Sequence, residues 1–329
     1  MKKKLSIVIP TFNRCYLLMD CVESIIVSSQ GFEDRFELIV SNDASTDETE
    51  EVVRTLQDKY PLIKYIRNEK NLYTDKHFTK IIENANFEFF WIIGDDDKIT
   101  KNAMQEVFKQ LDNDKNLIYC NYSVWNKDFS QIINENGLSQ YSNIEFKNHD
   151  HILSTIAFNM GYISSVIGCK QHFTDIPISK RMEFDGFTMP QVYPLYAGQI
   201  KQSNAILIAE TLIMNRAGNN SENKWHHIFV NGSNKIYKGL NKIGYSKKTI
   251  RLATFKVLLD YIIPHTVSLK IHKHNLYEYE FILLLKNYYS FPLFYLLCII
   301  ILIPNIFIKK HKKIIEKIPF YLKNKYGKI

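Results

Sequence analysis

The stretch LSIVIPTFNRCYLLMDCVESIIVS, residues 5–28, decides the fold class. Residues 5–10 are a short, apolar, β-branched run, which is typical of a strand buried on both faces. Residues 11–14 (TFNR) form a polar turn, and apolar residues then recur at helical spacing through residues 17–26. A strand that passes through a short turn into a helix is the unit of a parallel sheet.

The same alternation continues to about residue 125. Strand-like runs are expected at residues 36–41, 63–67, 88–94 and 117–122, with helical patterns between them. Beyond this point strand-like pieces remain at 162–167 and 205–216, and a helical pattern covers 249–286. The sequence therefore predicts an α/β fold, with a mostly parallel sheet flanked by helices, in three regions: 1–125, 126–230 and 231–329.

Charge and cysteine content exclude several classes of protein. The net charge is +8, and residues 309–329 hold eight lysines and one glutamate, so this tail carries +7 of it. A general nucleic-acid binder would carry its basic surface on the folded domain, so we expect no nucleic-acid partner. Five widely spaced cysteines without a CxxC motif argue against a disulfide framework and a structural zinc site.

The basic tail follows an apolar segment, residues 291–308, which Pro304 and Asn305 interrupt. As one helix it would be about 27 Å long, slightly short of the roughly 30 Å hydrocarbon core. Three interpretations stay open: a membrane-spanning or re-entrant anchor, a helix in the membrane interface, and a buried core helix. The lysines favour contact with an anionic membrane surface. At the other end of the chain we expect a first strand and no cleaved signal peptide.

Acidic residues follow two of the expected strands. Residues 42–47 (NDASTD) follow one, and residues 94–97 (GDDD) follow another. Ligands of open α/β sheets bind at the carboxyl ends of the strands, where these acids should converge. Three adjacent carboxylates repel one another, and a divalent cation such as Mn²⁺ or Mg²⁺ would remove that conflict. The alternative is a solvated acidic turn before the next helix.

Three motifs together, LSIVIPTFNR, VSNDASTDET and FFWIIGDDD, resemble glycosyltransferase family 2, which has the GT-A fold. The likeness is good over residues 4–125 and looser to about 230. It implies that 1–125 is the nucleotide-sugar-binding half and 126–230 the acceptor-binding half. Beyond this likeness, the residue pattern itself predicts that 231–329 is a helical C-terminal region with the apolar segment 291–308 and the basic tail 309–329. The GDDD ending resembles transferases that add deoxyhexoses to bacterial surface polysaccharide.

The resemblance also assigns roles to residues. The donor nucleotide would contact the strand-end residues Pro10, Thr11, Arg14, Asn42, Asp43, Asn71, Asp95 and Asp96. Asp43 would read the base, and Asp97 with Asp95 would bind the metal ion. The sequence departs from the family where Asn42 and Ala44 flank Asp43, and where Tyr73, Thr74 and Asp75 replace small residues.

The second half of the chain supplies the remaining candidate site residues. An acidic pair, Glu183 and Asp185, is the best match to the family's catalytic base, and we favour Asp185. Both could instead be surface acids at a helix end. The acceptor side would include Ser164, Ser165, Arg216, Trp225 and His226.

These residues imply an inverting, metal-dependent glycosyltransferase. It would move a hexose or deoxyhexose from a nucleotide-diphosphate sugar to a hydroxyl of a lipid-linked or surface glycan. We expect it at the cytoplasmic face of the inner membrane. Two alternatives remain: a sugar-phosphate nucleotidyltransferase, and a non-catalytic protein that binds nucleotide or glycan at the membrane.

Overall fold

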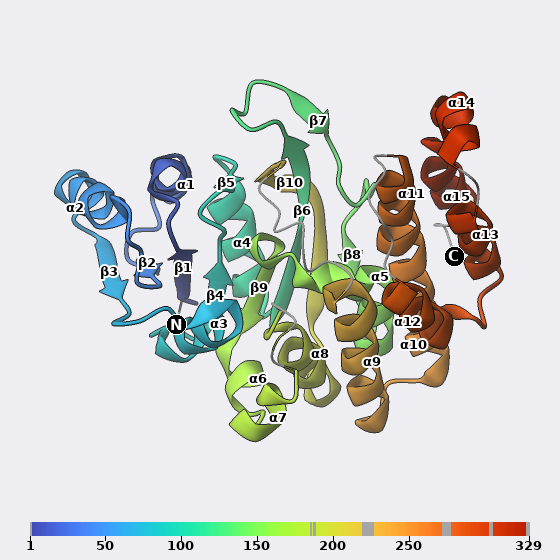
Figure 1. The fold of residues 1–329 in the computed structure, drawn as a ribbon. Helices are drawn as coiled ribbons and strands as arrows, with labels where there is room; N and C mark the ends of the chain where they lie inside the picture. Colours follow the sequence, from blue (N-terminus) through green and yellow to red (C-terminus); the bar gives the residue numbers. More distant parts are fainter. Residues whose placement is uncertain are drawn as a thin grey trace. The chain divides into compact units, whose positions relative to one another are not determined.

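The computed structural model describes residues 2–184, 186, 189–218, 227–271, 278–302 and 305–326. The chain forms two compact units (Figure 1). The first comprises residues 1–152 and 159–220, and the second comprises 153–158 and 221–329. The three regions expected from the sequence stay a prediction.

The first unit contains one sheet with the strand order β3-β2-β1-β4-β9-β6-β10-β5. β7 pairs with β6, and β8 pairs with β10. The strands are β1 Leu5–Thr11, β2 Phe36–Asn42, β3 Ile63–Arg67, β4 Phe89–Ile92, β5 Lys98–Ile99, β6 Leu117–Trp125, β7 Ile132–Asn134, β8 Ile144–Glu145, β9 Val166–Cys169 and β10 Ala205–Arg216.

The strands expected in the first 125 residues are all present, although β4 is shorter than expected. Strands β3, β2, β1 and β4 are parallel, β9 is antiparallel to both β4 and β6, and β10 is parallel to β6. Every residue of β1 and β2 is buried, as expected for central strands covered on both faces. The α/β fold with a helix-flanked sheet is confirmed.

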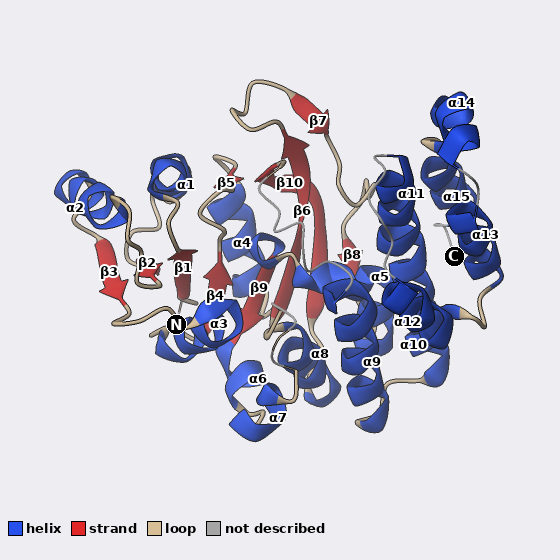
Figure 2. Cartoon of the chain, viewed as in Figure 1, coloured by secondary structure: helices blue, strands red, loops and turns tan. Residues whose placement is uncertain are grey.

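Helices connect these strands and cover the sheet (Figure 2). The helices of the first unit are α1 Cys15–Ser28, α2 Thr49–Lys59, α3 Tyr73–Asn84, α4 Ala103–Asp112, α6 Lys170–Thr174, α7 Ile178–Met182 and α8 Val192–Lys201, with a short 3₁₀ turn at η2 Ile163–Ser165. The helix α5 His149–Ile156 and the 3₁₀ turn η1 Ala157–Gly161 each contain residues of both units. The periodic apolar residues Leu17, Leu18, Cys21 and Ile25 form the buried face of α1.

The strand expected at residues 162–167 is wrong in its first half. Residues 163–165 form the turn η2, and the strand β9 begins only at Val166. The backbone N–H of Ser165 donates to the carbonyl of Tyr162 (3.1 Å), which closes a tight turn where an extended strand was expected.

The described residues of the second unit are helical (Figure 2). Its elements are η4 His227–Gly232, α9 Ser233–Lys242, α10 Lys247–Val257, η5 Leu258–Ile262, α11 Ile263–Ile271, α12 Glu278–Tyr288, α13 Pro292–Leu302, α14 Asn305–Ile315 and α15 Ile318–Tyr326. The apolar segment 291–308 thus falls on two helices, α13 and α14. Across the part of the chain that the structure describes, no helix has both the length and the apolar character needed to cross a bilayer.

Candidate active site

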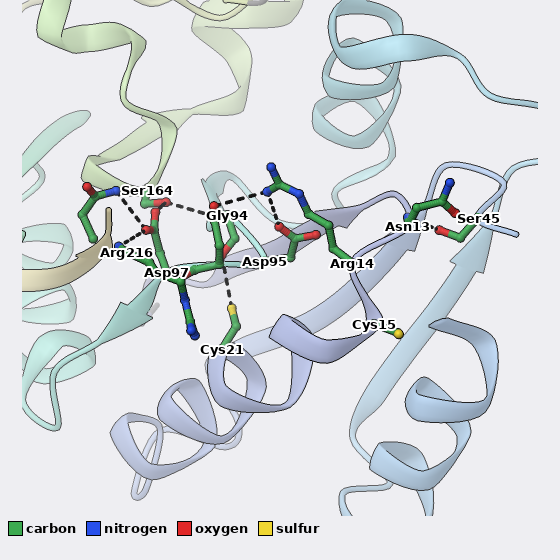
Figure 3. A network of polar contacts seen from close by, with 12 residues as sticks. Asn13, Arg14, Cys15, Cys21, Ser45, Gly94, Asp95, Asp97, Ser164 and Arg216 are labelled. Carbon is green, nitrogen blue, oxygen red and sulfur yellow. Dashed lines mark hydrogen bonds and ion pairs between the residues drawn. The ribbon is translucent and has the colours of Figure 1, made fainter. Parts of the chain in front are cut away.

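Two loops at the carboxyl ends of β1 and β2 are joined by hydrogen bonds (Figure 3). The backbone N–H of Asn13 donates to Ser45 Oγ (2.9 Å), and the N–H of Thr46 donates to Asn13 Oδ1 (2.8 Å). Asn13 has a φ of 54°, a left-handed conformation that asparagine tolerates better than most residues. The first two motifs of the sequence therefore form one connected edge.

Asp43 is buried beyond the end of β2, and the loop after β3 holds one of its oxygens. Its Oδ1 accepts hydrogen bonds from Asn68 Nδ2 (2.8 Å) and from the backbone N–H of Leu72 (2.9 Å). Its Oδ2 lies 3.9 Å from His77 Nδ1. Burial lowers the pKa of His77 despite the nearby carboxylate, so this ring is neutral near pH 7. Two donors already bind Oδ1, so Oδ2 is the oxygen suited to a ligand's N–H group.

Asn42, the residue before Asp43, uses its side chain for hydrogen bonds within the protein. Its Nδ2 donates to the Tyr65 hydroxyl (2.8 Å), and its Oδ1 accepts from the backbone N–H of Ser45 (2.8 Å). The side chain is fully buried and bonded to protein on both sides. Its geometry indicates that Asn42 supports the loop.

The acidic loop follows β4 and is paired with Arg14 (Figure 3). Arg14 Nη1 donates to Asp95 Oδ1 (3.0 Å) and to Asp96 Oδ2 (3.2 Å). The Asp96 side chain is 19% exposed and that of Asp95 is 5% exposed. A Cβ atom at Gly94 would lie 2.9 Å from Asp96 Oδ1, so a larger residue there would displace that carboxylate. The first and third motifs of the sequence therefore meet through an ion pair.

Asp97 points into the protein and accepts four hydrogen bonds. Its Oδ2 accepts from the Tyr162 hydroxyl (2.9 Å) and from Ser164 Oγ (2.5 Å). Its Oδ1 accepts from Asn215 Nδ2 (3.1 Å) and from the backbone N–H of Arg216 (3.3 Å). A carboxylate has about four acceptor sites, and here protein donors occupy that number. This arrangement leaves Asp97 little capacity to bind a metal ion.

Comparison with known proteins identifies the family. The model for "Glycosyl transferase family 2" matches residues 6–168. This region belongs to glycosyltransferase family 2. It contains β1, β2, β4 and the acidic loop, so the residues brought together at the sheet edge lie within the family 2 region.

Curated relatives are similar over part of their length. Abequosyltransferase RfbV of Salmonella typhimurium is 33% identical over 132 residues, which cover 40% of this chain and 39% of the relative. The GalNAc(5)-diNAcBac-PP-undecaprenol beta-1,3-glucosyltransferase of Campylobacter jejuni is 37% identical over 109 residues, which cover 32% and 34%. The similarity thus spans little more than a third of either relative.

Solved structures share the fold of this chain. S. aureus TarS 1–349 in complex with UDP aligns with a TM-score of 0.59 at 14% identity, over 91% of this chain and 88% of TarS. The mannosyltransferase PcManGT from Pyrobaculum calidifontis, in complex with GDP-Man and Mn²⁺, aligns with a TM-score of 0.55 at 12% identity, over 100% and 89%. At these identities the likeness establishes the fold alone.

The acidic loop of the family 2 region has the chemistry that a divalent cation needs. Among the described residues, no group of three or more His, Cys, Asp or Glu side chains is arranged to hold a metal ion. Mg²⁺, however, usually takes only one or two carboxylates and completes its shell with water and phosphate oxygens. Asp95 and Asp96 are two such carboxylates. Arg14 supplies one positive charge against three adjacent acids.

Burial raises the pKa of two acids in this loop. The pKa of Asp95 rises to about 6 through burial and the charge of Asp96, although Arg14 opposes the shift. The pKa of Asp97 rises to about 7 through burial and the charge of Asp96, although hydrogen bonds from Ser164 and Tyr162 oppose it. Without a cation, the folded loop therefore holds protons that the unfolded chain would release.

The raised pKa of Asp97 predicts that the free energy of unfolding depends on pH. Between about pH 4 and pH 7 the folded state binds more protons at Asp97 than the unfolded state, so ionisation of this group destabilises the fold as pH rises. In EDTA, we expect the free energy of unfolding of the wild type to fall relative to that of Asp97→Asn between pH 5 and pH 8. Urea unfolding at both pH values measures this difference, and histidine effects common to both proteins cancel. A constant difference would contradict the raised pKa.

Two predicted acceptor-side residues instead support the acidic loop (Figure 3). Ser164 Oγ donates to Asp97 and accepts from the backbone N–H of Gly94 (3.0 Å). Arg216 donates through Nε to the carbonyl of Asp96 (3.0 Å) and through Nη2 to Asp20 Oδ2 (2.9 Å). Both residues are buried. Their contacts indicate a structural role in support of the acidic loop, and contact with an acceptor stays a prediction.

The structure describes some of the remaining candidate site residues and not others. Pro10 and Thr11 are buried at the end of β1, and Ser165 is buried in η2. Asn71 accepts from the backbone N–H of Tyr73 through Oδ1 (2.7 Å). Glu183 is exposed and pairs with Lys180 (2.8 Å). Asp185, Trp225 and His226 lie outside the described residues.

Sequence reasoning missed three supporting residues. Asn68 holds Asp43, and Tyr162 and Asn215 hold Asp97. Tyr162 lies 65 residues from Asp97 along the chain, and Asn215 lies 118 residues away. A motif search could not link such distant positions. For Tyr162, the only signal was its place beside Ser164 in the segment GYISS.

Proposed function

We propose that this protein is an inverting, metal-dependent glycosyltransferase that uses a nucleotide-diphosphate sugar. One observation carries the proposal: Asp43 and the Arg14–Asp95–Asp96 cluster lie on neighbouring strand ends of one sheet edge. Such an edge offers an acceptor for a base and charged groups for a diphosphate. The names of the relatives support transfer of a deoxyhexose or a hexose, and one TarS structure contains UDP-GlcNAc.

The donor half of the reaction depends on binding and charge. Asp43 Oδ2 accepts an N–H group of the base, and the guanidinium of Arg14 lies beside the carboxylates that face the diphosphate. Asp96 and Asp95 would hold Mn²⁺ or Mg²⁺, which neutralises charge on the departing nucleoside diphosphate. We assign the metal to Asp96 in place of Asp97, because protein donors surround Asp97.

The acceptor half needs a base that removes the proton of the attacking hydroxyl. Attack from the face opposite the leaving group inverts the anomeric centre, and a carboxylate within hydrogen-bond reach is the required base. Asp185 is our candidate from the sequence. Glu183 is the second candidate, and its pairing with Lys180 at the surface makes it the weaker one.

Replacement of this base should separate binding from chemistry. We expect Asp185→Asn to lower the turnover number at least 100-fold, because general base catalysis typically contributes a factor of this size. Donor affinity should stay unchanged. Steady-state kinetics and calorimetry with the donor measure the two quantities. Full activity in Asp185→Asn together with a large loss in Glu183→Gln would assign the base to Glu183.

The C-terminal unit carries exposed apolar side chains beside its basic tail. On and directly after α12 these are Ile282, Leu285 and Tyr289, and on α13 they are Tyr295, Ile299 and Leu302. On each helix the spacing of three or four residues places the three side chains on one face. Exposed apolar faces next to lysines are typical of helices that lie in a membrane interface.

We therefore propose that this unit binds the anionic cytoplasmic face of the inner membrane. The undecaprenol-linked substrate in the name of the Campylobacter relative supports a lipid-linked glycan as the acceptor. An enzyme bound to the membrane would share one surface with such an acceptor, so their encounter would require diffusion only along that surface.

Charge removal in the tail tests this attachment. We expect the triple substitution of Lys313, Lys317 and Lys325 by glutamine to weaken binding to vesicles containing anionic lipid about 100-fold, at about 1 kcal/mol per lysine. Co-sedimentation measures the binding. As a control, substitution of the exposed Lys70 and Lys101 of the first unit by glutamine should leave it unchanged. Equal binding to neutral vesicles would contradict the electrostatic contribution.

A thermal-shift screen tests the proposed function directly. UDP-, dTDP-, GDP- and CDP-sugars are added with and without Mn²⁺, since a ligand of the native state raises the melting temperature. A metal-dependent shift with one nucleotide, lost in Asp96→Ala, is the expected result. Turnover of a nucleoside triphosphate with a sugar phosphate would indicate a nucleotidyltransferase. Binding without any transfer to a glycan would indicate a non-catalytic protein.

A further inference from the structure

Tyr73 has an unusual backbone conformation beside the candidate donor site. It is the first residue of α3, has a φ of 61° and is 77% exposed. A bulky residue with positive φ is a genuine outlier, and such strain persists only where the surrounding structure imposes it. Strained residues of this kind cluster at ligand-binding sites. The strain at Tyr73 therefore needs an explanation.

Hydrogen bonds from the backbone of Tyr73 and of the residue before it hold this conformation. The N–H of Leu72 donates to Asp43 Oδ1 (2.9 Å), and the N–H of Tyr73 donates to Asn71 Oδ1 (2.7 Å). Asn68, which also donates to Asp43, accepts from Lys80 (2.7 Å). The segment that carries Tyr73 is thus fixed directly to the carboxylate that we propose reads the base.

Packing does not explain why a tyrosine occupies this position. A side chain that is 77% exposed gains little from burial, so the ring contributes little to the stability of the unliganded fold. A glycine would adopt the same backbone conformation without strain. The strained position therefore places an aromatic face in solvent, one residue from a contact with Asp43.

We propose that the ring of Tyr73 stacks on the nucleobase of the donor, whose edge Asp43 binds. This inference rests on the proposed function and adds a residue that determines affinity. Stacking of a base on an aromatic ring contributes about 1–3 kcal/mol and tolerates every base, because each base has a π face. Tyr73 therefore provides affinity without selectivity, whereas Asp43 provides selectivity.

Substitutions at position 73 test whether the aromatic ring contributes to nucleotide binding. Calorimetry with UDP, dTDP, GDP and CDP in the presence of Mn²⁺ first identifies the nucleotide that the wild type binds. For that nucleotide, we expect Tyr73→Ala to raise Kd about tenfold and Tyr73→Phe to leave it within twofold. In kinetics with the corresponding sugar nucleotide, Tyr73→Ala should raise KM for the donor and leave kcat unchanged.

A glycine variant separates the ring from the backbone. Tyr73→Gly should raise the melting temperature by about 2–4 °C through relief of strain, and should still weaken nucleotide binding as Tyr73→Ala does. Asp114→Gly is the matched control. Asp114 also has a positive φ (57°), but it precedes β6 and so lies at the opposite edge of the sheet. This control should leave Kd unchanged.

The outcomes distinguish this inference from the proposed function. If the wild type binds a nucleotide and Tyr73→Ala binds it equally well, the stacking role is wrong and the proposed function stands. If Tyr73→Gly loses affinity while Tyr73→Ala keeps it, the loop conformation matters and the ring does not, which also overturns the inference. If no nucleotide binds the wild type, both proposals fail.

Discussion

Asp96→Ala is expected to lower the rate of sugar transfer about 1,000-fold. Asp96 is the more exposed of the two acids that pair with Arg14, and it borders the proposed position of the diphosphate. Loss of one group that stabilises developing charge typically lowers the turnover number by a factor of 100–1,000, and loss of a metal ligand should reach the upper end. The same variant should lose its affinity for Mn²⁺.

Two measurements and one control variant make this prediction specific. Titration of Mn²⁺ by electron paramagnetic resonance follows metal binding without any turnover. Donor kinetics over a range of Mn²⁺ concentrations follow the effect on transfer. Asp58→Ala, which removes an exposed acid of α2, should change neither result. An Asp96→Ala protein that retains tight Mn²⁺ binding would show that the cation is held elsewhere.

Asp97→Ala is expected to destabilise the first unit by about 3 kcal/mol. The substitution removes the acceptor of four hydrogen bonds and leaves buried or partly buried donors from Tyr162, Ser164, Asn215 and Arg216 unsatisfied. Each unsatisfied buried donor costs about 1–3 kcal/mol, although the two hydroxyl groups can rotate to other partners. Urea unfolding at pH 7 measures the loss.

Asp97→Asn serves as the matched variant for this prediction. Its amide keeps one acceptor oxygen, and the hydroxyls of Tyr162 and Ser164 can accept from its NH₂ group, so the expected loss of stability is only about 1 kcal/mol. Mn²⁺ affinity should persist in this variant. Loss of Mn²⁺ binding in a folded Asp97→Asn protein would return the metal role to Asp97, as the motif alone suggested.

The first half of the fold could be predicted because its signals are local. The strands β1, β2 and β3 and the helices between them follow from apolar periodicity within single segments. The convergence of Arg14 with the acidic loop also followed, because parallel strands bring their carboxyl ends to one edge. To predict these parts of the site, only the direction of the strands had to be known.

The parts that the sequence could not predict depend on contacts distant in sequence. The strand order places β9 between β4 and β6, and nothing in the segment 162–167 indicated that its first half turns back to reach Asp97. The carboxylate of Asp97 looks identical in sequence to those of Asp95 and Asp96. Only the neighbours from η2 and β10 distinguish it, so the motif could not show which acid faces the protein.

The hydrogen bonds of Asp97 also set an order of events during synthesis. They join position 97 to Tyr162 and Ser164, and to Asn215 and Arg216 at the end of β10. A nascent chain that has reached residue 125 already contains all three family motifs, yet it lacks these partners. The ribosome must therefore release another 91 residues, through Arg216, before the acidic loop is fully anchored. A fragment that contains only the motifs would include the candidate donor residues without the scaffold that positions them.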